Sequence, residues 1–148
     1  NFAVRAVFQC AKNWLFRTGL SAMPEKTILI VEDDDDLRNM LYLLFSKDYC
    51  VLEAADGHEA LGLYISEKPD LVITDNRMPR ITGLQFAILM HEEKRRRRIP
   101  VVMITAYKIE PSDLRKANID AFIEKPFDPA DLRATVERLL NGGDSTPE

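Results

Sequence analysis

The chain has 148 residues, 46% of them hydrophobic, which indicates one domain with a real core and excludes a disordered chain. Its formal net charge of −4 excludes a general electrostatic affinity for nucleic acid, and no apolar run approaches the ~20 residues of a membrane helix. Two cysteines, Cys10 and Cys50, make no disulfide framework, so a cytoplasmic, reducing setting fits best.

Residues 1–24 differ from the rest, because they carry basic residues and no acid. Met23 stands just before the first strand pattern, so we interpret it as the native start and residues 1–22 as a vector-encoded leader. A basic amphipathic anchor or a targeting peptide is the alternative, since apolar residues recur there at near-helical spacing. We expect the folded domain to span 25–141 and residues 142–148 to form a frayed, flexible tail.

Short apolar runs typical of strands alternate with stretches of helical spacing along the remaining chain. The runs are Thr27–Val31, Cys50–Ala55, Leu71–Thr74, Val101–Thr105 and Ala121–Ile123. This alternation predicts an α/β fold, with a five-stranded parallel sheet doubly wound by five helices. The continuous apolar runs should be central strands, and the mixed second run should be an edge.

Helix-end signals agree with this pattern. Asp34–Asp36 predict a solvated first helical turn, which we prefer over extra metal ligands. The other signals are two prolines at first helical positions, an N-cap and two left-handed C-terminal caps: Pro111, Pro129, Asp128, Asn118 and Gly142.

Chemically active side chains follow four of the five predicted strands. Glu32 and Asp33 follow the first, Asp75 the third, Thr105 ends the fourth and Lys125 follows the fifth. Carboxyl ends of parallel strands meet at one edge of a sheet, where ligands bind, so we expect these groups to converge. Clustered carboxylates repel unless a cation intervenes, and Mg2+ prefers oxygen ligands. A hydroxyl and an ammonium group can then hold a phosphoryl group that the Asp75 carboxylate attacks.

These segments resemble the signature segments of response-regulator receiver domains of two-component signalling, chemotaxis receivers included. The resemblance rests on ILIVEDD at 28–34, ADGHEAL at 55–61, DLVITDNRMP at 70–79, PVVMITA at 100–106 and KPF at 125–127. It covers about residues 25–141 and implies a flavodoxin-like (βα)5 fold with strand order 2-1-3-4-5.

The resemblance also implies a site for Mg2+ and phosphate. Asp75 is then the residue phosphorylated by a sensor histidine kinase or a phosphotransfer protein. Asp33 and Asp75 are direct metal ligands, Glu32 acts through water, and the backbone carbonyl of Arg77 is a further ligand. No enzymatic activity is implied beyond self-catalysed phosphotransfer and dephosphorylation.

A conformational switch is implied as well. Lys125 pairs with the phosphoryl group, and the Lys125–Pro126 bond is expected to be cis. Thr105 reads the phosphoryl group and Phe122 is the switch aromatic, so the face made by the fourth helix, fifth strand and fifth helix changes. A downstream effector protein or an output domain outside this chain would read that face, without direct nucleic-acid or membrane binding.

Two departures from the family pattern stand out. Ile119 and Asp120 replace a small Gly-Ala pair before the fifth strand. Arg77 and Tyr107 are bulky at positions that border the phosphorylated Asp in this family. We hypothesise that they shield the acyl phosphate and slow its hydrolysis.

Two other functions compete with this interpretation. A hydrolase of the dehalogenase-like class also uses an Asp nucleophile, but its motif after the first strand fails at Asp36 and Leu37. A phosphorylation-independent binding module is the other alternative.

Several remaining residues receive simpler interpretations. Lys94–Arg98 is interpreted as a solvated helix end rather than a site for nucleic acid or an acidic partner. His58 and His91 are too far apart for a metal pair, and His91 is expected at the surface. Cys50 is expected to pack within its strand.

Overall fold

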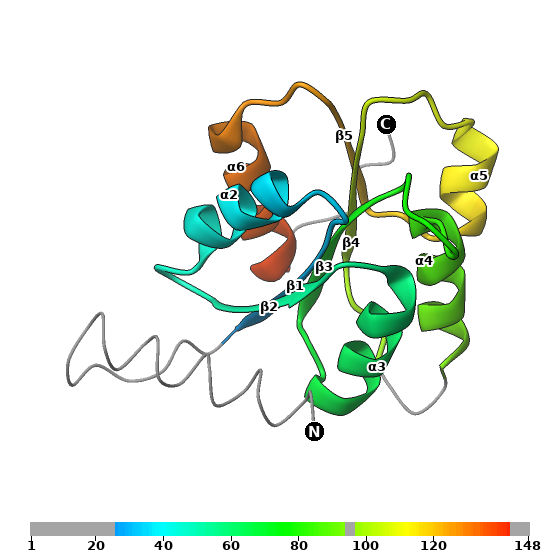
Figure 1. The fold of residues 1–148 in the computed structure, drawn as a ribbon, viewed down its shortest axis with the longest axis horizontal. Coiled ribbons are helices and arrows are strands. Elements are labelled where there is room, and N and C mark those ends of the chain that lie inside the picture. The colour runs from blue at the N-terminus through cyan, green and yellow to red at the C-terminus, as the bar shows by residue number, and fades with distance from the viewer. Residues whose placement is uncertain (1–25, 94–96, 143–148) are drawn as a thin grey trace.

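The computed structural model describes residues 26–93 and 97–142, and in them five strands alternate with five helices (Figure 1). The elements are β1 (Thr27–Val31), α2 (Asp35–Phe45), β2 (Cys50–Ala54), α3 (Gly57–Glu67), β3 (Leu71–Asp75), α4 (Gly83–Glu92), β4 (Val101–Thr105), α5 (Pro111–Lys116), β5 (Ala121–Glu124) and α6 (Pro129–Leu140).

All strand pairs are parallel, and the order across the sheet is β2-β1-β3-β4-β5. Helices α2 and α6 cover one face, and α3, α4 and α5 lie on the other (Figure 1). The predicted fold class and strand order are therefore confirmed. The predicted central strands are central, and β2 is an edge.

The core has two layers because side chains alternate across each strand. In β1, Ile28 and Ile30 pack with α2 and α6, whereas Leu29 and Val31 pack with α3 and α4. All four side chains are almost fully buried, and each burial contributes roughly 1.5–3 kcal/mol. The two-sided burial of β1, β3 and β4 explains their unbroken apolar sequences.

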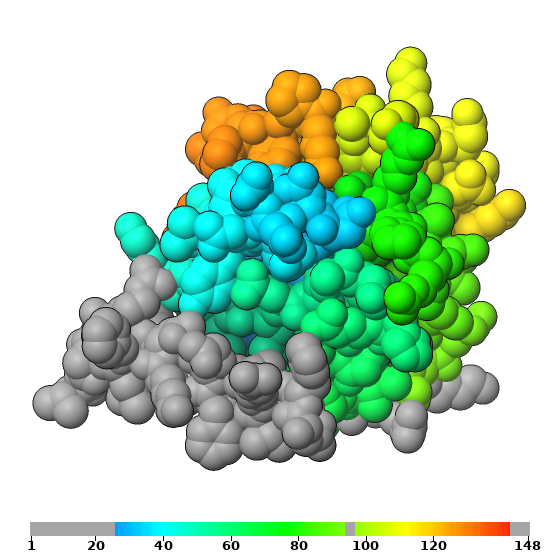
Figure 2. Space-filling view, viewed as in Figure 1, coloured from blue at the N-terminus to red at the C-terminus, as the bar shows by residue number. Residues whose placement is uncertain are grey.

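Helices α2 and α6 lie side by side over their face of the sheet (Figures 1 and 2). Arg133 on α6 joins them, since its Nη1 donates to the Leu44 carbonyl at 2.8 Å and its Nη2 pairs with Asp48. These contacts set the position of α2, whose first turn borders the carboxyl edge of the sheet.

The predicted helix signals are confirmed. Asp34 caps α2 by accepting the Leu37 N–H, and Asp128 caps α6 by accepting the Ala130 N–H. Pro111 and Pro129 occupy first-turn positions, and Asn118 and Gly142 have positive φ: 52° and 80°. Strand ends differ from prediction by one residue at β2, β3 and β5.

The two residues of the basic run that the structure describes, Arg97 and Arg98, do not form a helix end, which corrects the prediction for them. Helix α4 ends at Glu92, and the two arginines that the structure describes lie in the connection to β4. Arg97 pairs with Asp70 at 2.5 Å and Arg98 pairs with the buried Asp120 at 3.0 Å. These carboxylates are distant in sequence, so no local pattern predicts where the two arginine side chains lie. Residues 94–96 lie outside the described residues.

Of two further expectations, the one for His91 needs correction. His91 lies at the end of α4, where Nε2 is buried and has no hydrogen-bond partner among the described residues. Cys50, the first residue of β2, is buried at 9% exposure, so its predicted packing within the strand is confirmed.

No helix in the described part of the chain combines the length and apolar character needed to cross a membrane.

Candidate functional site

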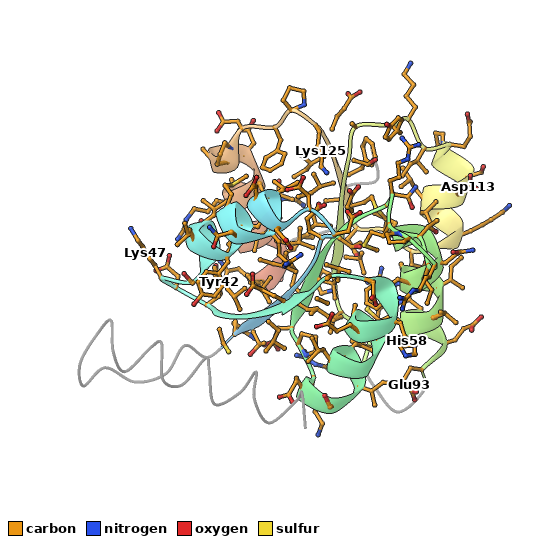
Figure 3. All side chains as sticks on the ribbon, in the orientation of Figure 1. Tyr42, Lys47, His58, Glu93, Asp113 and Lys125 are labelled. Atoms are coloured by element: carbon orange, nitrogen blue, oxygen red, sulfur yellow. The ribbon has the colours of Figure 1, made fainter. Side chains whose placement is uncertain are left out.

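The predicted site residues lie at the carboxyl edge of the sheet. Glu32 and Lys125 each follow a strand directly, whereas Asp75 and Thr105 are the last residues of theirs. Strand register brings these ends level, because Asp75 pairs with Ile104, one residue before Thr105. In Figure 3, Lys125 lies at this edge, between the loops that lead to α5 and α6.

Three carboxylates converge there. Oxygens of Glu32, Asp33 and Asp75 all lie within 4.8 Å of one another. Glu32 and Asp75 are buried, with exposures of 2% and 8%, whereas Asp33 is exposed to solvent. The cluster therefore has a buried floor and one open side from which an ion or a phosphoryl donor can approach.

Lys125 provides a positive charge within this cluster. Its Nζ lies 3.2 Å from Asp75 Oδ2 and 3.5 Å from Glu32 Oε2, and its side chain is 23% exposed. One ammonium group thus bridges the two buried carboxylates.

The charge of the cluster is not balanced by that lysine. Burial raises the pKa of Glu32 to about 7, and the Asp75 charge acts in the same direction. The backbone N–H of Asp34 and the Lys125 ammonium act in the opposite direction. A group of carboxylate oxygens with this unmet demand for positive charge fits a hard divalent cation such as Mg2+.

Several contacts hold the carboxylates in place. The Asp34 N–H donates to Glu32 Oε1 at 3.1 Å, and Arg38 Nη1 donates to the Glu32 carbonyl at 2.8 Å. The Arg77 N–H donates to Asp75 Oδ1 at 3.3 Å. Arg38 was missed by sequence reasoning, since its role depends on α2 crossing the end of β1 and no motif marks it.

Gly83, the first residue of α4, is a second missed residue. A Cβ there would overlap the Asp75 carbonyl oxygen and lie 2.9 Å from Asn76 Cα. The absence of a side chain allows α4 to start directly against the end of β3, where the Gly83 N–H donates to the Asn76 carbonyl at 2.9 Å. The backbone that carries Asp75 is fixed by this contact.

The predicted switch residues lie on the neighbouring strands. Thr105 is 1% exposed, its Oγ1 accepts the Tyr107 N–H at 3.2 Å, and its carbonyl accepts the Lys125 N–H. Phe122 lies on β5, half-buried and in register with Met103 of β4. The Lys125–Pro126 peptide bond is cis, as the resemblance implied.

Arg77 and Tyr107 meet over the loops that border the site. The Arg77 guanidinium carbon lies 4.5 Å from the centroid of the Tyr107 ring, a cation–π contact. Arg77 follows β3 and Tyr107 follows β4, so the stacked pair joins the loops after Asp75 and Thr105.

Comparison with known proteins assigns the family. The family model described as the response regulator receiver domain matches residues 28–137. The chain belongs to the response regulator receiver family. It is a receiver of two-component signalling, and receivers of this family are signalling domains rather than classical enzymes. The dehalogenase-like alternative does not fit this assignment.

Curated relatives of this receiver domain are longer than the chain. It is 36% identical over 118 residues to response regulator Rre1 of Synechocystis, covering 77% of this chain and 51% of that protein. It is 32% identical to the alkaline phosphatase synthesis regulator PhoP of Bacillus subtilis, covering 78% of this chain and 48% of that protein. The chain thus spans about half of these two regulators.

Solved structures share the receiver fold. The chemotaxis protein CheY4 of Vibrio cholerae has a TM-score of 0.72 and 27% identity, over 77% of this chain and 98% of that one. The response regulator TrrA of Thermotoga maritima, solved in complex with Mg2+ and BeF, has a TM-score of 0.68 and 34% identity over the same shares.

Proposed function

We propose that Asp75 accepts a phosphoryl group from a histidine kinase or phosphotransfer protein. Mg2+ would be held by Asp33, Asp75 and the Arg77 carbonyl, with Glu32 acting through a water molecule. The observation that supports this proposal is the cluster of three carboxylates within 4.8 Å, with Lys125 Nζ 3.2 Å from Asp75.

The chemistry is a group transfer that needs mainly positioning and positive charge. An oxygen of the Asp75 carboxylate forms a bond to phosphorus as the phosphorus–nitrogen bond of the donor phosphohistidine breaks. The electron pair of that bond stays on the imidazole. A bound Mg2+ would supply positive charge to the phosphoryl oxygens. Lys125 would shift from the carboxylate to another of these oxygens, and Thr105 would donate its hydroxyl to a third.

The same step can change the surface of the domain. In the structure Lys125 is paired with Asp75 and Glu32, and Thr105 Oγ1 accepts a backbone N–H. Drawing both groups towards the phosphoryl oxygens alters the ends of β4 and β5 and makes room for Phe122 to turn inward. The face formed by α5, β5 and α6 would then shift from one packing towards another. A downstream effector or output domain would recognise the packing that becomes more populated.

Phosphotransfer to matched variants tests the proposal. Wild type incubated with acetyl phosphate and Mg2+ should gain one phosphoryl group by intact mass, and Asp75→Asn should gain none. Asp33→Asn should lose most of the incorporation, because it removes a metal ligand from the open side. Asp36→Asn is the matched control: this acid is exposed in the first turn of α2 and should react like wild type.

The possible results separate the alternatives. Equal incorporation into wild type and Asp75→Asn would place the acceptor elsewhere and refute the proposal. If acetyl phosphate modifies no residue and beryllofluoride with Mg2+ leaves the NMR spectrum unchanged, the phosphorylation-independent binding module is the better interpretation.

A further inference from the structure

The outward face of α4 exposes two neighbouring aliphatic side chains between polar ones. It carries Gln85, Ile88, Leu89 and Glu92, spaced by three and four residues. Ile88 and Leu89 are 39% and 38% exposed. A helix with a buried inner face normally presents polar residues outward, so two adjacent exposed aliphatic residues indicate a contact surface.

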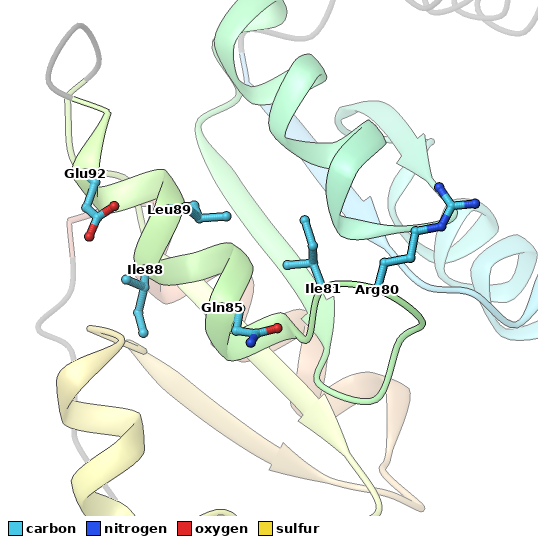
Figure 4. A pocket seen from close by; sticks show the side chains of 6 residues that line it. All are labelled: Arg80, Ile81, Gln85, Ile88, Leu89 and Glu92. Carbon is cyan, nitrogen blue, oxygen red and sulfur yellow. The ribbon is translucent and has the colours of Figure 1, made fainter.

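These four residues, with Arg80 and Ile81 of the preceding loop, line a shallow cavity of about 390 Å³, which we call the α4 groove (Figure 4). None of the six groove residues belongs to the carboxylate cluster or is Lys125 or Thr105, although Arg80 and Ile81 lie in the loop that follows Asp75. The groove is therefore not part of the function proposed above.

Charge divides the α4 groove into two ends. Arg80 and the positive end of the helix dipole mark one end, and the first turn of α4 contains no acid. Glu92 marks the other end, where the dipole is negative. Arg80 is 75% exposed and lies 4.0 Å from Asp56, at the limit of an ion pair, so its guanidinium can turn to another carboxylate.

The order of residues along the face is self-complementary. In an antiparallel pair of α4 helices, Gln85 of one copy opposes Glu92 of the other, and Ile88 opposes Leu89. Gln85 Oε1 already accepts the Thr82 N–H, so its NH2 group is the part that can donate to the opposite carboxylate. Arg80, in the loop before α4, can add a positive charge beside these Glu92 contacts when its side chain turns from Asp56.

We propose that the α4 groove is an interface between two copies of this chain, packed antiparallel about a two-fold axis between Ile88 and Leu89. Such an axis needs one patch that complements itself, which the charge order and the central aliphatic pair provide. One helix face is a small contact, so the dimer is reversible and depends on concentration.

Sedimentation equilibrium of the unphosphorylated full chain tests the proposal. Wild type should show a monomer–dimer equilibrium, and Ile88→Asp should weaken it about tenfold or more. Leu43→Asp is the matched control, since it places the same charge on a 57% exposed leucine of α2 and should leave the equilibrium unchanged. Circular dichroism melting of each variant shows that lost association is not lost folding.

Charge reversal tests the antiparallel arrangement itself. Arg80→Glu alone places two acids together, and Glu92→Arg alone places two cations together, so each variant should associate more weakly than wild type. An equal mixture of the two variants should recover association, because every contact in the mixed dimer then joins opposite charges.

Two outcomes would overturn the proposal. A wild type that stays monomeric at about 1 mM would leave the groove to a different protein. A dimer that ignores Ile88→Asp, or a mixture that fails to recover, would mean that copies pair through another surface or another arrangement.

Discussion

At the residue scale, the stacked Arg77 and Tyr107 side chains bear on the lifetime of the proposed acyl phosphate. Water must reach the phosphorus past this pair, and opening an exposed cation–π contact costs about 0.5–1 kcal/mol, a factor of roughly two to five in rate. Replacing both residues with Ala should therefore speed loss of the phosphoryl group about two- to fivefold. Decay of phosphorylated protein on phosphate-affinity gels measures the rate.

Tyr107→Phe is the control for this prediction. It keeps the ring face that the guanidinium contacts and should decay at the wild-type rate. If the double Ala variant and Tyr107→Phe decay equally, the stacked pair does not shield the phosphoryl group.

His91 gives the domain a pH-dependent stability. Burial lowers the pKa of His91, and the Arg98 guanidinium acts in the same direction, opposed by the carbonyls of Asn118 and Ala117 and by the Asp120 carboxylate. The unfolded chain, with a His pKa of about 6.5, then binds more protons than the folded chain, so this contribution destabilises the fold as pH falls below about 6.5.

Urea unfolding at pH values of about 7.5 and 5.5 tests this effect. His91→Gln should lose less stability on acidification than wild type, whereas His58→Gln, which changes an exposed histidine of α3, should behave as wild type does (Figure 3). Equal pH dependence in all three proteins would show that His91 has no part in it.

Sequence patterns could predict the positions of Glu32, Asp33, Asp75, Thr105 and Lys125 because each follows or ends an apolar run. Parallel strands carry their carboxyl ends to one edge, so one-dimensional spacing becomes three-dimensional proximity. Arg38 and Asp120 were not predictable in this way. Their partners are a carbonyl at the end of β1 and an N–H at the start of β4, groups that no side-chain pattern reveals.

At the scale of elements, the start of α4 is coupled to the end of β3 through Gly83. Gly83→Ala forces a methyl group against the Asp75 carbonyl, so we expect a loss of about 1–3 kcal/mol in the free energy of unfolding. Because Asp75 itself is displaced, phosphoryl incorporation should also fall.

Gly62→Ala is the matched substitution. It lies inside α3 with nothing within 4 Å of the added Cβ, so it should stabilise the domain by roughly 0.5–1 kcal/mol and leave incorporation unchanged. Denaturant unfolding and intact mass measure both properties, and equal effects of the two substitutions would contradict the role given to Gly83.

Element boundaries were predictable where a cap or a proline marks them, as at Asp34, Asp128 and Pro129. The end of α4 was not predictable, since Lys and Arg are good helix formers and the basic run therefore favours continuation of the helix. Backbone geometry at Glu93, which is extended, ends the helix there, and tertiary ion pairs hold Arg97 and Arg98.

At the scale of the whole molecule, the carboxylate cluster links cation binding to folding. A ligand that binds the folded state alone adds about 2.7 kcal/mol when present at 100 times its Kd. Mg2+ should therefore raise the melting temperature of wild type, and Asp33→Asn should lose most of that rise. Asp36→Asn should keep it; an equal rise in both variants would place the ion elsewhere.

The opposite edge of the sheet is held by a repeated arrangement. Asp70, just before β3, accepts the Thr27 N–H at the start of β1 and pairs with Arg97. Asp120, just before β5, accepts the Val101 N–H at the start of β4 and pairs with Arg98.

The contacts of Asp70 and Asp120 at this end of the sheet thus involve none of the residues that form the carboxylate cluster at the other end. We expect that loops at the reactive end can be exchanged or lengthened, because the strand ladders and the hydrogen bonds of these two aspartates hold the other end of the sheet. The residues that determine reactivity can therefore change, in evolution or in protein engineering, without a change in the sheet that carries them.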